Sequence, residues 1–113
     1  MDPDRARELL AEERQRIEHA LAGLRREDVG ELADRDEPAD QASDLYENEM
    51  DEGLAAGLRE TLAAVERAEA RLAAGTYGLS VESGRPIPDE RLEAVPAAER
   101  TADEQERYDR RSG

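Results

Sequence analysis

The sequence predicts a mainly α-helical protein built as a long antiparallel helical hairpin, a coiled coil. Apolar residues recur at helical spacing over two stretches of roughly 30 residues, and a turn that contains a proline separates the stretches. Charged residues make up 41% of the chain and hydrophobic residues 37%, with no Phe and no Trp. Such a composition favours a thin coiled coil over a large globular core.

The first helix is expected from about residue 3 to about residue 33. Asp2 followed by Pro3 is a typical helix start, because aspartate caps the first turn and proline fits the first helical position. The apolar stripe that follows consists of Leu10, Ile17, Leu21 and Leu24.

The segment 34–40 is the predicted turn, because it has no apolar periodicity and Pro38 disfavours helical geometry at Glu37. A second helix is expected from Asp40 or Ser43 to a C-terminal glycine at Gly75. Its apolar stripe consists of Leu54, Leu58, Leu62, Val65, Ala68 and Leu72. Two long helices joined by a short turn must run antiparallel to bury their stripes against each other.

Two glycines interrupt the second helix. Gly53 and Gly57 each cost about 1 kcal/mol relative to alanine in a helix interior. They predict either a hinge near the turn or a close crossing of the two helices, and the sequence leaves both open.

After Gly75 the pattern changes. Residues 77–88 alternate apolar and polar side chains around a glycine turn, which predicts a small β-hairpin or knuckle. A short helical turn over 89–95 should stop at Pro96, and a final short helix is expected from about Thr101 to about Arg110.

The net charge of −14 repels phosphate backbones, so we expect a protein partner and no direct nucleic-acid binding. No segment approaches the apolar length of a membrane-spanning helix, and the N-terminal segment lacks a signal-peptide pattern. A soluble, cytoplasmic protein is the expectation. The absence of cysteine excludes disulfides, thiolate nucleophiles and cysteine-ligated zinc.

The sequence gives little support for a catalytic site or a metal site. The only histidine, His19, lies off the apolar stripe without a nucleophile beside it. Asp34, Asp36 and Asp40 have the spacing of a calcium loop, but Ala39 stands where such a loop requires glycine. We therefore expect no enzymatic activity, no metal and no cofactor.

The segment after Gly75 carries a long ordered motif. It reads Tyr77-Gly78-x-Ser80-x-x-Ser83-Gly84-x-Pro86-Ile87-Pro88-x-x-Arg91-Leu92-Glu93-Ala94-x-Pro96. The motif closely resembles the C-terminal zinc finger of the bacterial TraR/DksA-type transcription regulators, in which the pattern is YG-x-C-x-x-C-G-x-x-I-x-x-x-R-L-E-A-x-P, followed by a second C-x-x-C. The resemblance covers nearly the whole chain, because those proteins place the finger directly after a long antiparallel coiled coil. It implies residues 1–75 as the coiled-coil hairpin and 76–113 as a zinc-finger-like knuckle with a C-terminal helix.

The turn also resembles that family. Its coiled-coil tip carries a D-x-x-D-x-A motif, which Glu37, Asp40 and Ala42 match with glutamate in the first position. The resemblance thus implies an acidic partner-binding tip within 34–42, although Asp40 could also simply cap the second helix. Tyr46, just past the tip, either anchors the partner or packs on the first helix.

The zinc-ligand positions depart from the family pattern. By alignment they are occupied by Ser80, Ser83, Thr101 and Glu104. Neutral hydroxyls are not structural zinc ligands, so we expect a degenerate, metal-free finger held by hydrogen bonds and packing. The residues expected to pack on the end of the coiled coil in place of the metal are Leu79, Val81, Ile87, Leu92 and Val95.

The resemblance implies a regulator that binds RNA polymerase and inserts its acidic tip through the secondary channel to modulate transcription initiation. Some members respond to guanosine tetraphosphate through basic residues, and one such position is Ala64 here, which counts against that response. The alternative is a structural helical hairpin that dimerises or serves as an adaptor without polymerase activity.

Overall fold

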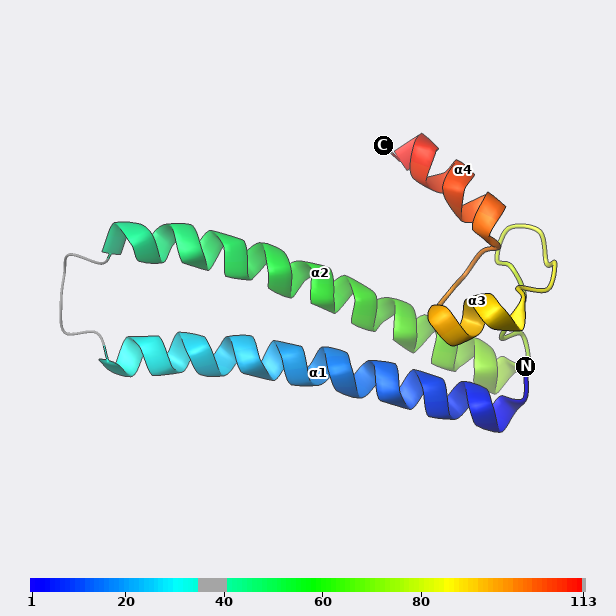
Figure 1. Cartoon of the computed structure of the whole chain (residues 1–113), viewed down its shortest axis with the longest axis horizontal. Helices are drawn as coiled ribbons and strands as arrows, with labels where there is room; N and C mark the ends of the chain where they lie inside the picture. The colour runs from blue at the N-terminus through cyan, green and yellow to red at the C-terminus, as the bar shows by residue number, and fades with distance from the viewer. Residues whose placement is uncertain (35–40, 113) are drawn as a thin grey trace. The chain divides into compact units, whose positions relative to one another are not determined.

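The computed structural model describes the backbone of residues 1–34 and 41–112 and the side chains of residues 1–24 and 52–112. Its helices are α1 (Pro3–Asp34), α2 (Gln41–Ala74), α3 (Asp89–Ala94) and α4 (Ala102–Ser112). The mainly α-helical prediction is confirmed. We call residues 76–101, between α2 and α4, the knuckle (Figure 1).

The described chain forms two compact units, and their division cuts across both long helices. One unit, the base unit, comprises Met1–Arg14 and Ala64–Gly113, and the other comprises Gln15–Ala63. The base unit therefore combines the start of α1, the end of α2 and everything that follows. The sequence predicts a boundary between residues 75 and 76, where the helical hairpin gives way to the knuckle. This boundary stays a prediction.

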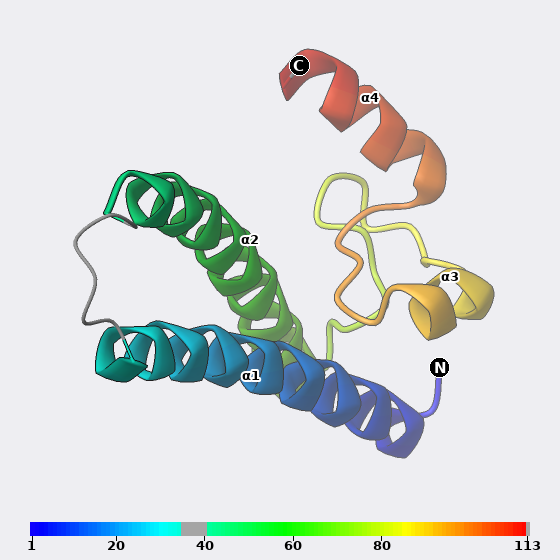
Figure 2. The ribbon, with the colours of Figure 1, turned by 60° about the vertical axis from the view of Figure 1, so that its left-hand side comes forward.

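Within the base unit, the start of α1 lies beside the end of α2 in antiparallel orientation (Figures 1 and 2). The guanidinium of Arg14 donates to Glu69 at 2.6 Å and 3.3 Å. A shallow groove is lined by Arg7 and Leu10 from α1 and by Glu69, Leu72 and Ala73 from α2. Higher residue numbers in α1 thus meet lower ones in α2. The buried seam of this pair consists of Ala6, Leu9, Leu10, Val65 and Ala68.

The apolar stripes are buried unevenly. Leu10 and Val65 are fully buried and Ile17 is nearly so, as the periodicity predicts. Leu54 was expected in the same stripe, but its side chain is 56% exposed. That expectation was wrong, because spacing along a helix does not say how far along its length the buried face extends.

The end of α2 follows the prediction for Gly75. The glycine has a positive φ of 80°, a conformation that side chains other than glycine avoid. Its N–H donates to the carbonyl of Leu72 at 3.2 Å, and the N–H of Thr76 donates to that of Arg71 at 2.9 Å. These two bonds form a Schellman cap, which stops the helix and sets the direction of the knuckle.

Gly53 and Gly57 have open surroundings. A Cβ atom built on either glycine meets no atom within 4 Å among the described residues. The α1 side chains from residue 25 onward lie outside the described residues, so the close crossing and the hinge both stay predictions.

The glycines offer a test in which one substitution has opposite effects. Gly57→Ala should stabilise the fold by about 1 kcal/mol, because alanine is the better helix former and its methyl group meets no atom within 4 Å among the described residues. Gly75→Ala should destabilise it, because φ at this residue is positive. Urea unfolding of both variants checks the pair. A destabilising Gly57→Ala would show that the position needs glycine for another reason.

Candidate functional site

The side chains of the predicted tip lie outside the described residues. Glu37 and Asp40 lie outside the described residues. Ala42 and Tyr46 belong to α2, but their side chains also lie outside them. The partner-binding assignments of these four residues therefore stay predictions, and the described candidate site is the knuckle with the first turn of α4.

The knuckle opens with a tight turn. Leu79 and Pro86 form an isolated antiparallel bridge, and the Ser80 N–H donates to the Arg85 carbonyl at 2.8 Å. Gly78 permits the turn with a φ of 84°. The predicted β-hairpin is thus reduced to a single bridge, and no strand extends from it among the described residues. Hydrogen bonds therefore hold the turn together.

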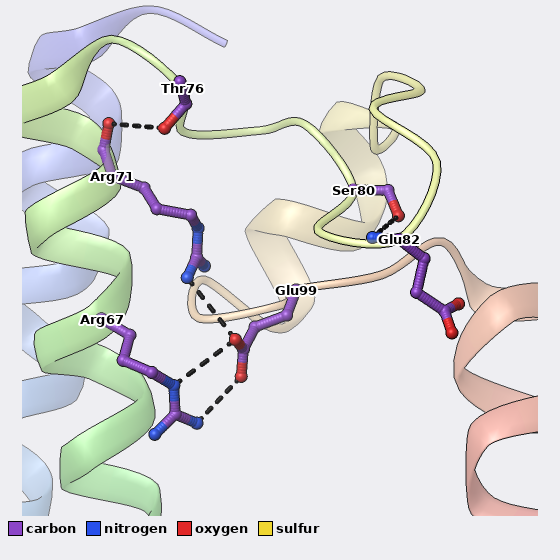
Figure 3. Close-up of polar contacts among 6 residues, drawn as sticks. All are labelled: Arg67, Arg71, Thr76, Ser80, Glu82 and Glu99. Carbon is purple, nitrogen blue, oxygen red and sulfur yellow. Dashed lines mark hydrogen bonds and ion pairs between the residues drawn. The ribbon is translucent and has the colours of Figure 1, made fainter.

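Ser80 organises the turn from inside. Its side chain is only 5% exposed, and its Oγ accepts the N–H groups of Glu82 at 3.1 Å and of Ser83 at 3.3 Å. Figure 3 shows the first of these contacts. A hydroxyl that accepts two backbone donors still has its own proton to donate. Ser80 can therefore link the turn to an acceptor on another segment.

That acceptor comes from the start of α4. The Thr101 N–H donates to Glu104 Oε1 at 3.0 Å, and the Glu104 N–H donates to Thr101 Oγ1 at 3.3 Å. This reciprocal pair is a capping box. Its Thr-x-x-Glu spacing is visible in the sequence, so the N-terminus of α4 could have been assigned from it.

Glu104 joins the two segments. Its carboxylate is buried and accepts hydrogen bonds from the hydroxyl of Ser83, from the Thr101 N–H and from the hydroxyl of Ser80, which together hold its pKa down at about 2. The structure thus brings together the four positions that the alignment placed at the family's zinc ligands.

A second carboxylate attaches the knuckle to α2. Glu99 accepts hydrogen bonds from Arg67 at 2.9 Å and 3.4 Å and forms an ion pair with Arg71 at 3.6 Å (Figure 3). The hydrogen bonds from Arg67, assisted by the charges of Arg71 and Arg100, lower the pKa of Glu99. Arg67 and Glu99 are 32 residues apart, so no local sequence pattern could have predicted this link. It fixes the segment before α4 to the last turns of α2.

Further hydrogen bonds close the knuckle on itself. The Tyr77 hydroxyl donates to the Pro96 carbonyl at 2.8 Å, and burial raises the pKa of that hydroxyl. The Val81 N–H donates to the Glu99 carbonyl at 2.8 Å. The segment that precedes α4 therefore lies against the turn.

The apolar core of the knuckle is small. Ile87, Leu92 and Ala98 are buried together, and Tyr77 packs against them partly buried. The expected packing roles of Ile87 and Leu92 agree with this burial, but Leu79, Val81 and Val95 are exposed. The expectation for these three was wrong, because the turn and the segment after α3 meet through backbone hydrogen bonds and polar side chains rather than through apolar packing.

The described residues show no other cluster that suggests a metal site or a membrane span. No group of three or more histidine, cysteine, aspartate or glutamate side chains among them could hold a metal ion. Within the same described residues, no helix has both the length and the apolar character that crossing a membrane requires.

The fold and this site define a helical hairpin with a zinc-finger-like knuckle. The family model of the prokaryotic dksA/traR C4-type zinc finger matches residues 75–110. The RNA polymerase-binding transcription factor DksA of Caulobacter vibrioides is 32% identical over 105 residues, which cover 92% of this chain and 68% of that protein. The chain belongs to the DksA/TraR family, whose members are regulators and not enzymes.

Other relatives match over shorter segments. The uncharacterized protein YteA of Bacillus subtilis is 47% identical over 70 residues, 61% of this chain and 29% of that protein. General stress protein 16O of the same organism is 38% identical over 81 residues, 70% of this chain and 50% of that protein. The chain thus spans half or less of the length of these two relatives.

The fold has a solved counterpart. The transcription factor DksA2 from Pseudomonas aeruginosa superposes with a TM-score of 0.83 at 29% identity, and the match covers 97% of this chain and 84% of that one. This likeness confirms the predicted fold class of a helical hairpin followed by a zinc-finger-like region.

The C4-type family model implies a zinc ion held by four cysteines, and the residues of this chain do not fit one. Three of the four positions offer neutral hydroxyl groups, which are not structural zinc ligands. The fourth, Glu104, is already engaged as a hydrogen-bond acceptor. We therefore derive no role for zinc in this knuckle.

Glu99 predicts a pH dependence of stability. Its pKa in the folded chain lies below the usual 4.5, so its stabilising contribution is present above about pH 4.5 and is lost as the pH falls through the lowered value. Wild type should be more stable than Glu99→Gln near neutral pH, and the difference should shrink in acid. Urea unfolding of both proteins at about pH 7 and about pH 3 measures it.

The charge-matched control is Glu90→Gln, which removes an exposed glutamate from α3. A difference between wild type and Glu99→Gln that does not change with pH would contradict the assignment. So would a Glu90→Gln variant that behaves as Glu99→Gln does.

Proposed function

We propose that the chain is a transcription regulator that binds RNA polymerase and acts by inserting its acidic tip into the secondary channel. The similarity to the RNA polymerase-binding transcription factor DksA of Caulobacter vibrioides carries the proposal, because it extends over 92% of this chain. The likeness of fold to the transcription factor DksA2 supports it.

The proposal divides the work between two parts of the chain. Residues 1–75 form the coiled coil whose tip, with Glu37, Asp40 and Ala42, acts on the polymerase, and Tyr46 is a further candidate contact. Residues 76–113 form the knuckle and C-terminal helix. The contacts of Glu99 with Arg67 and Arg71 support a knuckle attached to the last turns of α2.

Electrostatics favours a protein surface over nucleic acid as the direct contact. The net charge of −14 opposes approach to phosphate backbones, so the surface that receives the chain should be basic where they touch. RNA polymerase as partner implies a cytoplasmic location. A response to guanosine tetraphosphate is not part of the proposal, because Ala64 stands at a position that is basic in responsive members.

If the tip acts on the polymerase, a substitution there should remove the effect on transcription initiation without removing polymerase binding. Asp40→Asn removes one charge from the tip and leaves the described contacts of the base unit untouched. In an in vitro transcription assay this variant should lose the effect on initiation but still bind polymerase, because the knuckle and the helix shafts are unchanged. Asp36→Asn, which removes a charge from the same turn outside the motif, is the matched control and should keep the effect. An Asp40→Asn variant as active as wild type would contradict the tip assignment.

A pull-down of purified RNA polymerase tests the proposal as a whole. We expect specific retention of polymerase that weakens as salt increases, because part of the attraction is electrostatic. No retention at low salt would reject the proposal and favour a structural hairpin that dimerises or serves as an adaptor.

A further inference from the structure

We propose that the carboxylate of Glu104 replaces the metal ion as the structural centre of the knuckle, tying the turn around Ser80 to the start of α4. The two segments it joins are about 20 residues apart in sequence, and the apolar core of Ile87, Leu92 and Ala98 includes no residue of either segment. Polar contacts are therefore expected to hold α4 against the turn.

Independent contacts place the two segments side by side. The Val81 N–H donates to the Glu99 carbonyl at 2.8 Å, and Arg100 lies 3.8 Å from the carboxylate of Glu82. Both contacts join the turn to the residues just before α4. Among the described residues, the buried polar or charged side chains are those of Ser80 and Glu104. A buried carboxylate is costly unless donors surround it, and these contacts bring the donors to it.

Donors surround the carboxylate of Glu104. Its Oε1 accepts the Thr101 N–H at 3.0 Å, and the hydroxyls of Ser83, Ser80 and Thr101 act on the same carboxylate and help to lower its pKa. A carboxylate offers about four acceptor sites, so all of them can be used. Ser80 has its own acceptor capacity filled by two backbone N–H groups, which leaves its proton for Glu104.

The arrangement inverts the electrostatics of a zinc finger. A structural zinc site surrounds a central cation with anionic thiolates, whereas this knuckle surrounds a central anion with neutral donors. The position of Glu104 in the first turn of α4 adds a favourable interaction with the helix dipole. Such a centre needs neither metal nor reduced thiols. The same four positions still converge, so cysteines placed there should form a zinc site.

The role of Glu104 is tested by Glu104→Gln against Asp103→Asn. Both variants remove one negative charge from the first turn of α4, so they change the interaction with the helix dipole alike. The inference predicts that Glu104→Gln lowers the Tm and speeds amide hydrogen exchange at Glu82, Ser83 and Thr101. Asp103→Asn should leave these exchange rates unchanged. Equal exchange rates in the two variants would overturn the inference.

Convergence of the four positions is tested by rebuilding the metal site. The variant S80C/S83C/T101C/E104C should bind one zinc ion per chain by elemental analysis and unfold at a higher temperature with zinc than with a chelator. The matched control S80C/S83C/T101C/D103C has the same number of cysteines with one displaced by a residue, and should bind zinc more weakly. Wild type with added zinc sets the baseline and should show no change in Tm. A rebuilt variant that binds no zinc, whether folded or not, would overturn the convergence, and so would a control that binds as tightly.

Discussion

A chain without cysteine has to close its knuckle with hydrogen bonds and ion pairs, and two carboxylates supply the connections on which the rest of the base unit depends. Glu104 joins the turn to α4, and Glu99 joins the intervening segment to α2 through Arg67 and Arg71. Both carboxylates have lowered pKa values, so both act as anions near neutral pH. The apolar core of Ile87, Leu92 and Ala98 is too small to do this alone.

This dependence on polar contacts agrees with the proposed function, in which the tip acts on the polymerase and the knuckle is a separate structural part. The base unit brings the first turns of α1, the last turns of α2 and the knuckle into one compact body. The predicted tip, residues 34–42, belongs to no part of the base unit, so a change in its chemistry need not alter the contacts of the base. The chain belongs to the DksA/TraR family although all four cysteine positions are replaced. The helices and the glycine turn are determined by local sequence patterns that do not involve the metal.

Local patterns predicted the helices well. The first helix was expected to end near residue 33, and α1 ends at Asp34. Gly75 was correctly predicted to end α2, because helix caps are determined by a few neighbouring residues. The alignment also selected Thr101 and Glu104, which the structure brings to Ser80 and Ser83.

What the sequence could not predict depends on surfaces that meet only in the fold. Leu54 belongs to a regular apolar stripe and is nevertheless exposed. Val81 was expected to pack through its side chain, but its backbone N–H makes the contact instead. The pairing of Arg67 with Glu99 joins distant parts of the chain, and in a sequence with so many charged residues no pattern selects this pair over others.

The knuckle is proposed to fold without a metal, and amide hydrogen exchange in the presence of a chelator is the most direct test. The N–H groups of Val81 and Ile87, which donate to the Glu99 and Gly78 carbonyls, should exchange slowly with a chelator present and equally slowly after zinc is added. Rapid exchange of both amides in chelator, with protection appearing only when zinc is supplied, would contradict it.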